Sequence, residues 1–150
     1  MYERFHIDLG FGDAVTGAPE PLVGDDLLAF AEIAPARVLA VPREQQFAEK
    51  LHAYTLARGE RVNTRTKDLV DMLLLMEAQP FDPVSLRSTV RETFARRATH
   101  PVPTTLLPPP EIWASEFTRM ATETRLGVVG LKEGFAILQT FWAELSDASK

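Results

Sequence analysis

Asp8 belongs to the first of three groups of side chains whose type and spacing could support chemistry. It lies in a segment, residues 5–11, where apolar and polar residues alternate, and a period of two predicts a half-buried strand. Asp8 falls on the face opposite the apolar one, although aspartate is depleted in strands. It is therefore either part of the solvated face of an edge strand or a carboxylate that a sheet holds in place to bind a divalent metal.

Lys50 is the second candidate. The apolar residues Phe47, Leu51 and Tyr54 recur at helical spacing, and Lys50 lies beside this stripe rather than opposite it. A helical lysine is usually only solvated, whereas a lysine close to a packed face could reach a triphosphate as a point charge.

Arg65, Lys67, Asp68 and Asp71 form the third group. The two aspartates are three residues apart and therefore share one helix face. The helix dipole accounts for Asp68 in the first turn, but Asp71 stands among apolar residues, where a buried carboxylate requires a partner. Lys67 or Arg65 could be that partner, and a structural ion pair and a site carboxylate give the same pattern.

Other chemistry-bearing residues give weaker patterns. His52 and His100 do not have the spacing of paired metal ligands, and the sequence has neither a Gly-x-x-x-x-Gly-Lys phosphate loop nor a Gly-x-Ser-x-Gly elbow. The segment 83–98 is made basic by Arg87, Arg91, Arg96 and Arg97. Such a face is either simply solvated or helps to hold RNA phosphates.

Changes in periodicity indicate the elements that position these residues. Residues 5–11 and 38–41 predict two strands, residues 14–26 a loop, and residues 27–34 either a short helix or a strand. From Arg43 the period becomes helical. We expect helices from near Pro42 to Gly59 and over about 66–78, 83–98, 111–123 and 131–146.

Asp82 and Pro83 suit the N-cap and first position of the third helix, and the proline-rich residues 99–110 predict an extended connector. Strands followed by helices indicate an α+β fold, with a β-rich region (1–42) and a helical region (43–150) in one compact domain. Two strands make a poor sheet by themselves, so we expect an exposed strand edge beside Asp8 through which the chain could pair with another copy.

Composition narrows the class of protein. The length of 150 residues suits one domain, and the net charge of -5 argues against a chain-wide basic footprint for nucleic acid, although a local basic patch remains compatible with it. The chain has no cysteine, no apolar run long enough to span a bilayer and no signal-peptide core near Met1. We expect a soluble cytoplasmic protein.

Four ordered stretches resemble the C-terminal part of the AbiEii/AbiGii toxin family. They are FHIDLGFGD (5–13), VPRE (41–44), AEKLHA (48–53) and NTRTKDLVDM (63–72), so the resemblance covers about residues 5–76. It implies a nucleotidyltransferase fold and a toxin of a toxin–antitoxin or phage-defence system. Such a toxin uses Mg²⁺ and an NTP, transfers nucleotides to an RNA acceptor such as tRNA, and has a cognate antitoxin.

The resemblance also implies residue roles. Asp8 would be a metal-binding carboxylate, Lys50 would contact the nucleotide phosphates with Arg65 and Lys67 nearby, and the essential acidic residue after it would be Asp68 or Asp71, with Asp71 favoured. The family's Gly-Ser or Gly-Gly turn with its Asp-x-Asp or Asp-x-Glu pair should precede Asp8, where only seven residues stand.

That departure leads us to expect a chain that is inactive alone, as an excised fragment, a decayed gene, a mis-called start or half of a split protein. Two other functions stay open. The chain could be a non-catalytic module that binds RNA, a nucleotide or an antitoxin, or a structural domain that forms homodimers.

Overall fold

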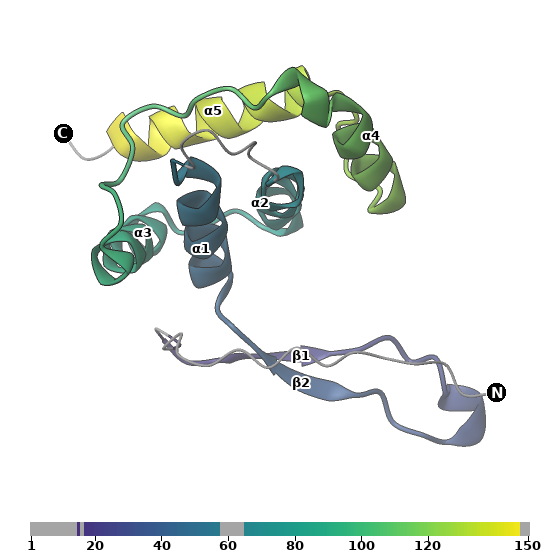
Figure 1. Ribbon diagram of the computed structural model, residues 1–150. Coiled ribbons are helices and arrows are strands. Elements are labelled where there is room, and N and C mark those ends of the chain that lie inside the picture. Colours follow the sequence, from purple (N-terminus) through teal and green to yellow (C-terminus); the bar gives the residue numbers. More distant parts are fainter. Residues whose placement is uncertain (1–14, 16, 58–64, 148–150) are drawn as a thin grey trace. The chain divides into compact units, whose positions relative to one another are not determined.

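The computed structural model describes residues 15, 17–57 and 65–147 (Figure 1). Two short strands precede five α-helices in the described chain, which confirms the predicted α+β class. The chain forms two compact units that divide between Pro42 and Arg43.

The first unit contains an antiparallel ribbon of β1 (Glu20–Val23) and β2 (Arg37–Ala40), in which Glu20 lies opposite Ala40. The second strand confirms the prediction for residues 38–41 to within one residue. The prediction of a loop over 14–26 is wrong, because β1 lies inside it. The predicted strand 5–11, with Asp8 and its edge, lies outside the described residues.

Pro21 explains why β1 is difficult to recognise. Gly24 N donates to Ala36 O at 2.9 Å, so alternate residues of β1 direct their N–H groups toward β2. Pro21, opposite Leu39, occupies a position whose N–H would point away from β2. Proline is tolerated there because each strand of a two-stranded ribbon is an edge strand. The ambiguous residues 27–34 contain a single 3-10 turn, η1 (Ala29–Ala31).

The second unit contains all the α-helices of the described chain, at the places that the sequence predicts. They are α1 (Arg43–Thr55), α2 (Thr66–Ala78), α3 (Pro83–Arg97), α4 (Ala114–Glu123), which follows the 3-10 turn η2 (Glu111–Trp113), and α5 (Leu131–Asp147). The N-cap prediction for α3 is confirmed, since Ser85 N donates to Asp82 Oδ2 at 2.9 Å and Pro83 is the first helical residue.

The core of this unit lies where α1, α2 and α3 pack together beneath α5 (Figure 1). Phe47 of α1 is fully buried and meets Phe81 and Phe141 edge to face, at centroid distances of 5.4 and 5.6 Å. Full burial of a side chain such as Phe47 stabilises the fold by about 1.5–3 kcal/mol. Gly134 lets α5 approach closely, because a Cβ there would lie 2.7 Å from Cζ of Phe117.

The extended connector between α3 and η2 is fastened to the helices by two side chains. Tyr54 Oη donates to Leu107 O at 2.9 Å, and Trp142 Nε1 donates to Pro103 O at 3.1 Å. Burial raises the pKa of Tyr54, so its hydroxyl remains a donor. These contacts hold the connector against α1 through Tyr54 and against α5 through Trp142.

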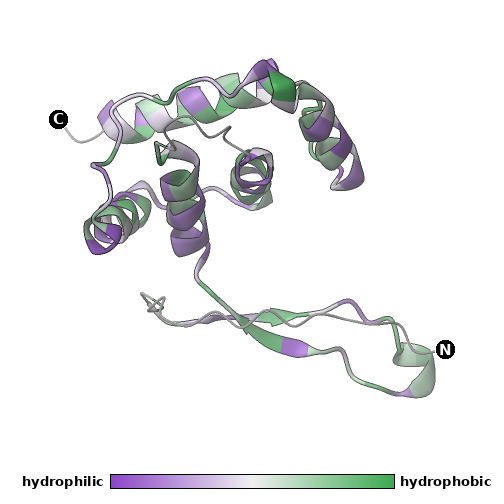
Figure 2. Ribbon diagram, viewed as in Figure 1, coloured by the Kyte–Doolittle hydropathy of each residue, from purple (hydrophilic) through white to green (hydrophobic). Residues whose placement is uncertain are grey.

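The first unit has a different surface character. Apolar residues dominate both strands in Figure 2, and large side chains such as Phe30 and Leu39 are 86% and 75% exposed. No helix within the described ranges is long and apolar enough to cross a membrane.

Candidate functional site

Lys50 lies between the two aspartates of the third predicted group. Its Nζ is 2.7 Å from Asp71 Oδ2 and 3.4 Å from Asp68 Oδ1. The packing of α1 against α2 produces this arrangement, because Leu51 and Leu69 are buried in the core and their neighbours stand at the edge of the same helix contact. The structure therefore brings together residues that are about twenty positions apart in the sequence.

The charges around Lys50 keep it protonated. Burial alone would lower the pKa of Lys50, but the hydrogen bond and charge of Asp71, together with Asp68, outweigh burial and raise the pKa above its ordinary value of 10.5. The ammonium group is thus a fixed positive charge, still one-third exposed, at the surface of the helical unit.

Asp68 is the more buried of the two carboxylates. Its side chain is 7% exposed against 25% for Asp71, whereas the sequence pattern favoured Asp71 as the buried one. The first turn of α2 is covered, since Thr66 is fully buried and its Oγ1 donates to Glu116 Oε2 of α4 at 3.1 Å. A helix that contacts neighbours on several sides buries its first turn as well as its centre.

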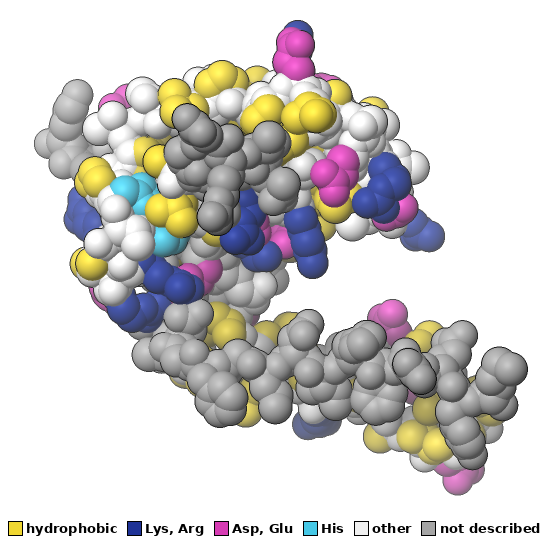
Figure 3. All heavy atoms as spheres, viewed as in Figure 1, with side chains coloured by type: hydrophobic (Ala, Val, Ile, Leu, Met, Phe, Trp, Pro, Cys, Tyr) yellow, Lys and Arg dark blue, Asp and Glu magenta, His cyan; other side chains and the backbone are white. Residues whose placement is uncertain are grey.

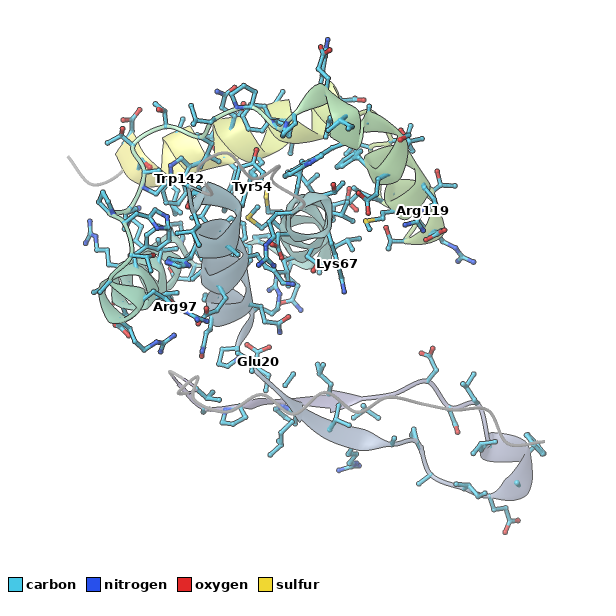
Figure 4. The ribbon with its side chains drawn as sticks, viewed as in Figure 1. Glu20, Tyr54, Lys67, Arg97, Arg119 and Trp142 are labelled. Carbon is cyan, nitrogen blue, oxygen red and sulfur yellow. The ribbon has the colours of Figure 1, made fainter. Side chains whose placement is uncertain are left out.

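The partners of the two carboxylates also differ from the prediction. Lys50 is the partner of Asp71, where the sequence suggested Lys67 or Arg65. Arg65 instead approaches Asp68, with Nη1 3.5 Å from Oδ2. Lys67 is exposed on α2 and extends away from the core (Figure 4). The third group therefore divides, with Lys67 outside the cluster.

Asp68 Oδ2 is a buried oxygen that accepts no hydrogen bond within the described part of the chain. Its ion pair with Arg65 is long. A buried acceptor without a donor is energetically costly, so this oxygen has the capacity to accept a hydrogen bond from a ligand.

A groove of about 340 Å³ opens beside this cluster. Its walls come from α1, the start of α2 and the end of α3, and both charge signs are represented. The lining residues are Glu49, Lys50, His52, Ala53, Leu56, Arg65, Asp68 and Arg97. Figure 3 shows Lys and Arg side chains gathered with carboxylates near the histidines on one face of this unit. Its size and charge suit a small polar anion better than an apolar ligand.

Glu49 occupies the end of the groove formed by α3. Its Oε1 accepts from Arg96 Nη2 at 2.7 Å, and its Oε2 accepts from Arg97 Nη2 at 2.6 Å and Nε at 3.1 Å. Figure 4 shows Arg97 at the lower end of α3, beside α1. The sequence singled out these arginines as a basic face but gave no signal for Glu49, because the pairing joins residues 47 and 48 positions apart.

Two histidines join the same end of the groove through threonine hydroxyls. Thr55 Oγ1 donates to Leu51 O at 2.8 Å, so it accepts from His100 Nε2 at 2.9 Å. Thr99 Oγ1 lies 2.9 Å from His100 Nδ1 and 2.8 Å from His52 Nε2. With neutral rings, Thr99 donates to His100 and accepts from His52. These linked hydrogen bonds fasten the residues after α3 to α1.

The environment of His52 favours its neutral form. Burial is the main cause, and the nearby His100 and Arg97 add to it against the opposing charge of Glu49, so the pKa of His52 lies below its usual value. His52 and His100 were weak candidates for metal binding, and the described residues contain no group of three His, Cys, Asp or Glu side chains that could hold a metal ion.

The described residues also do not fit a Mg²⁺ site at Asp68 and Asp71. Lys50 contacts both carboxylates and neutralises the charge that a cation would require. Asp8, the expected metal ligand, lies outside the described residues.

Comparison with known proteins gives one match and one negative result. A family model described as "Nucleotidyl transferase AbiEii toxin, Type IV TA system" matches residues 2–130. This match confirms the resemblance seen in the four motifs and extends it through α4. No curated protein matches the chain.

Proposed function

The chain belongs to the AbiEii family of nucleotidyl transferase toxins, and on that premise we propose that its helical unit binds the phosphates of an NTP. We also propose that the acceptor in nucleotidyl transfer is an RNA such as tRNA. The observation that supports this proposal is Lys50, a fixed positive charge at a groove of about 340 Å³ with Arg65 and Arg97 in its walls.

Each side chain of the cluster has a role in this proposal. In nucleotidyl transfer the acceptor hydroxyl loses its proton as its oxygen bonds to the α-phosphorus, and the bond from the α-phosphorus to the bridging oxygen of the β-phosphate breaks. Pyrophosphate leaves, so negative charge develops on the leaving phosphates. Lys50 and Arg65 would stabilise that charge electrostatically. Asp71 orients Lys50 through its 2.7 Å contact, and Asp68 Oδ2 would accept a hydrogen bond from a ligand hydroxyl.

The described helical unit contains no group of three His, Cys, Asp or Glu side chains that could hold a metal ion. We propose that Mg²⁺ would be held by carboxylates elsewhere, with Asp8 among them, and would help to neutralise the phosphates. The 150 residues contain no Asp-x-Asp or Asp-x-Glu pair, which the resemblance gives as the main ligands. We therefore expect this chain alone to bind triphosphate without transferring a nucleotide, and a cognate antitoxin to be its partner in a type IV system.

A second candidate function is a structural domain that forms homodimers. The exposed apolar residues of the first unit favour it, among them Leu27, Phe30 and Leu39, which are 77%, 86% and 75% exposed. In that case the Lys50 cluster would only join α1 to α2, and no anion would bind to it.

Thermal stability in the presence of each NTP separates the two functions. Binding to the native state raises the melting temperature by mass action. We expect stabilisation of the wild-type chain that Lys50→Ala abolishes and that Lys132→Ala, at an exposed lysine paired with Glu111, leaves unchanged. Equal stabilisation of the wild type and Lys50→Ala, or none in either, would refute the phosphate role of Lys50. Label transfer from NTP to bulk tRNA, with Mg²⁺ present, tests whether the chain is active alone.

A further inference from the structure

Arg97 lines the end of the groove farthest along α3, and it shares the carboxylate of Glu49 with its neighbour Arg96. Both oxygens of Glu49 are used, at 2.7 Å by Arg96 and 2.6 Å by Arg97. The two arginines lie in the last turn of α3, where positive charge also compensates the helix dipole. The dipole explains why arginines suit this turn, but it does not explain why both guanidinium groups converge on one anion at the groove.

The convergence of these groups matches the way proteins bind phosphate. Guanidinium groups donate charge-assisted hydrogen bonds to the oxygens of a carboxylate or of a phosphate, and here Arg96 donates to one oxygen of Glu49 and Arg97 to the other. The carboxylate of Glu49 therefore stands where a phosphate group of a ligand in the groove would bind. Arg97 and Glu49 both line the groove together with Lys50, so one extended polyanion could contact Lys50 and Arg97.

Glu49 is placed so that a ligand can displace it. Its side chain is 21% exposed, and those of Arg96 and Arg97 are 29% and 37% exposed. Partly exposed ion pairs of this kind are weaker than buried ones and remain open to competition from solvent and other ions. A phosphate makes strong charge-assisted hydrogen bonds to arginine. The terminal phosphate of a nucleotide also carries more negative charge than a carboxylate, whereas an RNA backbone phosphate carries the same single charge. A ligand phosphate can therefore compete with Glu49 for the two arginines.

We propose that Arg96 and Arg97 form a second phosphate subsite of the groove, and that Glu49 occupies this subsite until a ligand phosphate displaces it. The proposal rests on the proposed function, because the ligand reaches the subsite from the groove beside Lys50. The phosphate comes from a nucleotide or from an RNA backbone, which share this chemistry. Glu49 then lowers the affinity of the groove for every polyanion and makes binding selective for those long enough to reach both ends.

Calorimetric titration of the full chain with inorganic tripolyphosphate tests the subsite. The decisive variant is Glu49→Gln, which keeps the shape of the side chain and removes the competing charge. We expect its Kd to be about fivefold lower than that of the wild type, as for removal of one competing charge at contact distance in an exposed site. The matched control is Glu123→Gln, which removes a carboxylate paired with Arg119 at 2.8 Å on α4 and gives the same change in net charge.

The arginines provide the second arm. The double variant Arg96→Gln/Arg97→Gln should bind tripolyphosphate more weakly than the wild type. Adding Glu49→Gln to this double variant should not raise its affinity, because the arginines that Glu49 occupies are absent. If Glu49 only joins α1 to α3, Glu49→Gln should bind tripolyphosphate no better than the wild type. That result, or an equal gain in Glu123→Gln, would overturn the proposal. A circular dichroism melt of each variant confirms that it is folded.

A short single-stranded RNA, titrated in parallel, distinguishes the two sources of phosphate. A gain in Glu49→Gln for tripolyphosphate alone assigns the subsite to a nucleotide, and a gain for RNA alone assigns it to the acceptor. Lys50→Ala separates this inference from the proposed function. If Lys50→Ala weakens binding but Glu49→Gln does not strengthen it, only the subsite is refuted. If no protein binds either probe, both proposals are wrong.

Discussion

Replacing Lys50 by methionine should destabilise the chain, because Asp71 would lose its cation and Asp68 would be left, among the described residues, with the longer 3.5 Å contact with Arg65. Lys50→Met keeps most of the apolar stem and removes only the charge. The partners are 7% and 25% exposed and the lysine side chain 33%, so the cluster is intermediate between a surface pair and a buried one. We expect a loss of about 2 kcal/mol, between the ~1 kcal/mol of exposed pairs and the ~3–5 kcal/mol for breaking buried ones.

Urea denaturation at pH 7, followed by circular dichroism, measures this loss. Lys132→Met is the matched control, because Lys132 and its partner Glu111 are 90% and 89% exposed, and we expect its free energy of unfolding to change by less than about 0.5 kcal/mol. The pKa of Lys50 is raised above 10.5 in the fold, so its stabilisation is complete below pH 10.5 and is lost as the pH rises through the higher folded value. A Lys50→Met variant as stable as Lys132→Met would refute the reasoning.

Three further changes test the surrounding structure. Because the pKa of His52 is lowered below its usual 6.5, its contribution to stability is present above pH 6.5 and is lost as the pH falls toward the folded value; His52→Gln should therefore flatten the unfolding free energy between pH 7 and 5, and an unchanged slope would contradict this. Gly134→Ala would place a Cβ 2.7 Å from the buried ring of Phe117, and overpacking of about 1–3 kcal/mol should exceed the ~1 kcal/mol gain in helix propensity, so its urea midpoint should fall rather than rise. Asp82→Ala removes the acceptor for Ser85 N and should cost about 1 kcal/mol of unfolding free energy, whereas a neutral result would mean that the cap does not stabilise α3.

The helices could be predicted from the sequence because their signals are local. Residues 66–78 are apolar almost all round and are followed by Pro80, and α2 has these bounds. The side chain of Asp82 caps the N-terminus of α3, and Pro83 fits its first helical position. Both preferences can be recognised in the sequence. β1 was missed because Pro21 and its neighbouring glycines read as turn residues, and only pairing with β2 shows that Pro21 needs no N–H.

The cluster around Lys50 could be predicted by residue type but not by pairing. Lys50, Asp68 and Asp71 are candidates from the sequence, and the structure brings all three together. The depth of each aspartate depends on which helices cover α2, and the partner of each depends on the angle at which α1 crosses it. Glu49 gave no signal because its role arises only when the end of α3 meets α1. Tertiary packing decides such contacts, and a single sequence does not record it.

A two-dimensional NMR spectrum that correlates amide protons with their nitrogens tests the central claim most directly. The isotope-labelled chain is titrated with inorganic tripolyphosphate. The claim is that the groove beside Lys50 binds phosphate. It predicts that the largest changes in amide chemical shift fall on the residues around Lys50 in α1 and around Asp68 in α2. It also predicts that Lys50→Ala abolishes these changes. Shifts confined to the hollow near Arg87 and Arg91, or no shifts at millimolar tripolyphosphate, would contradict it.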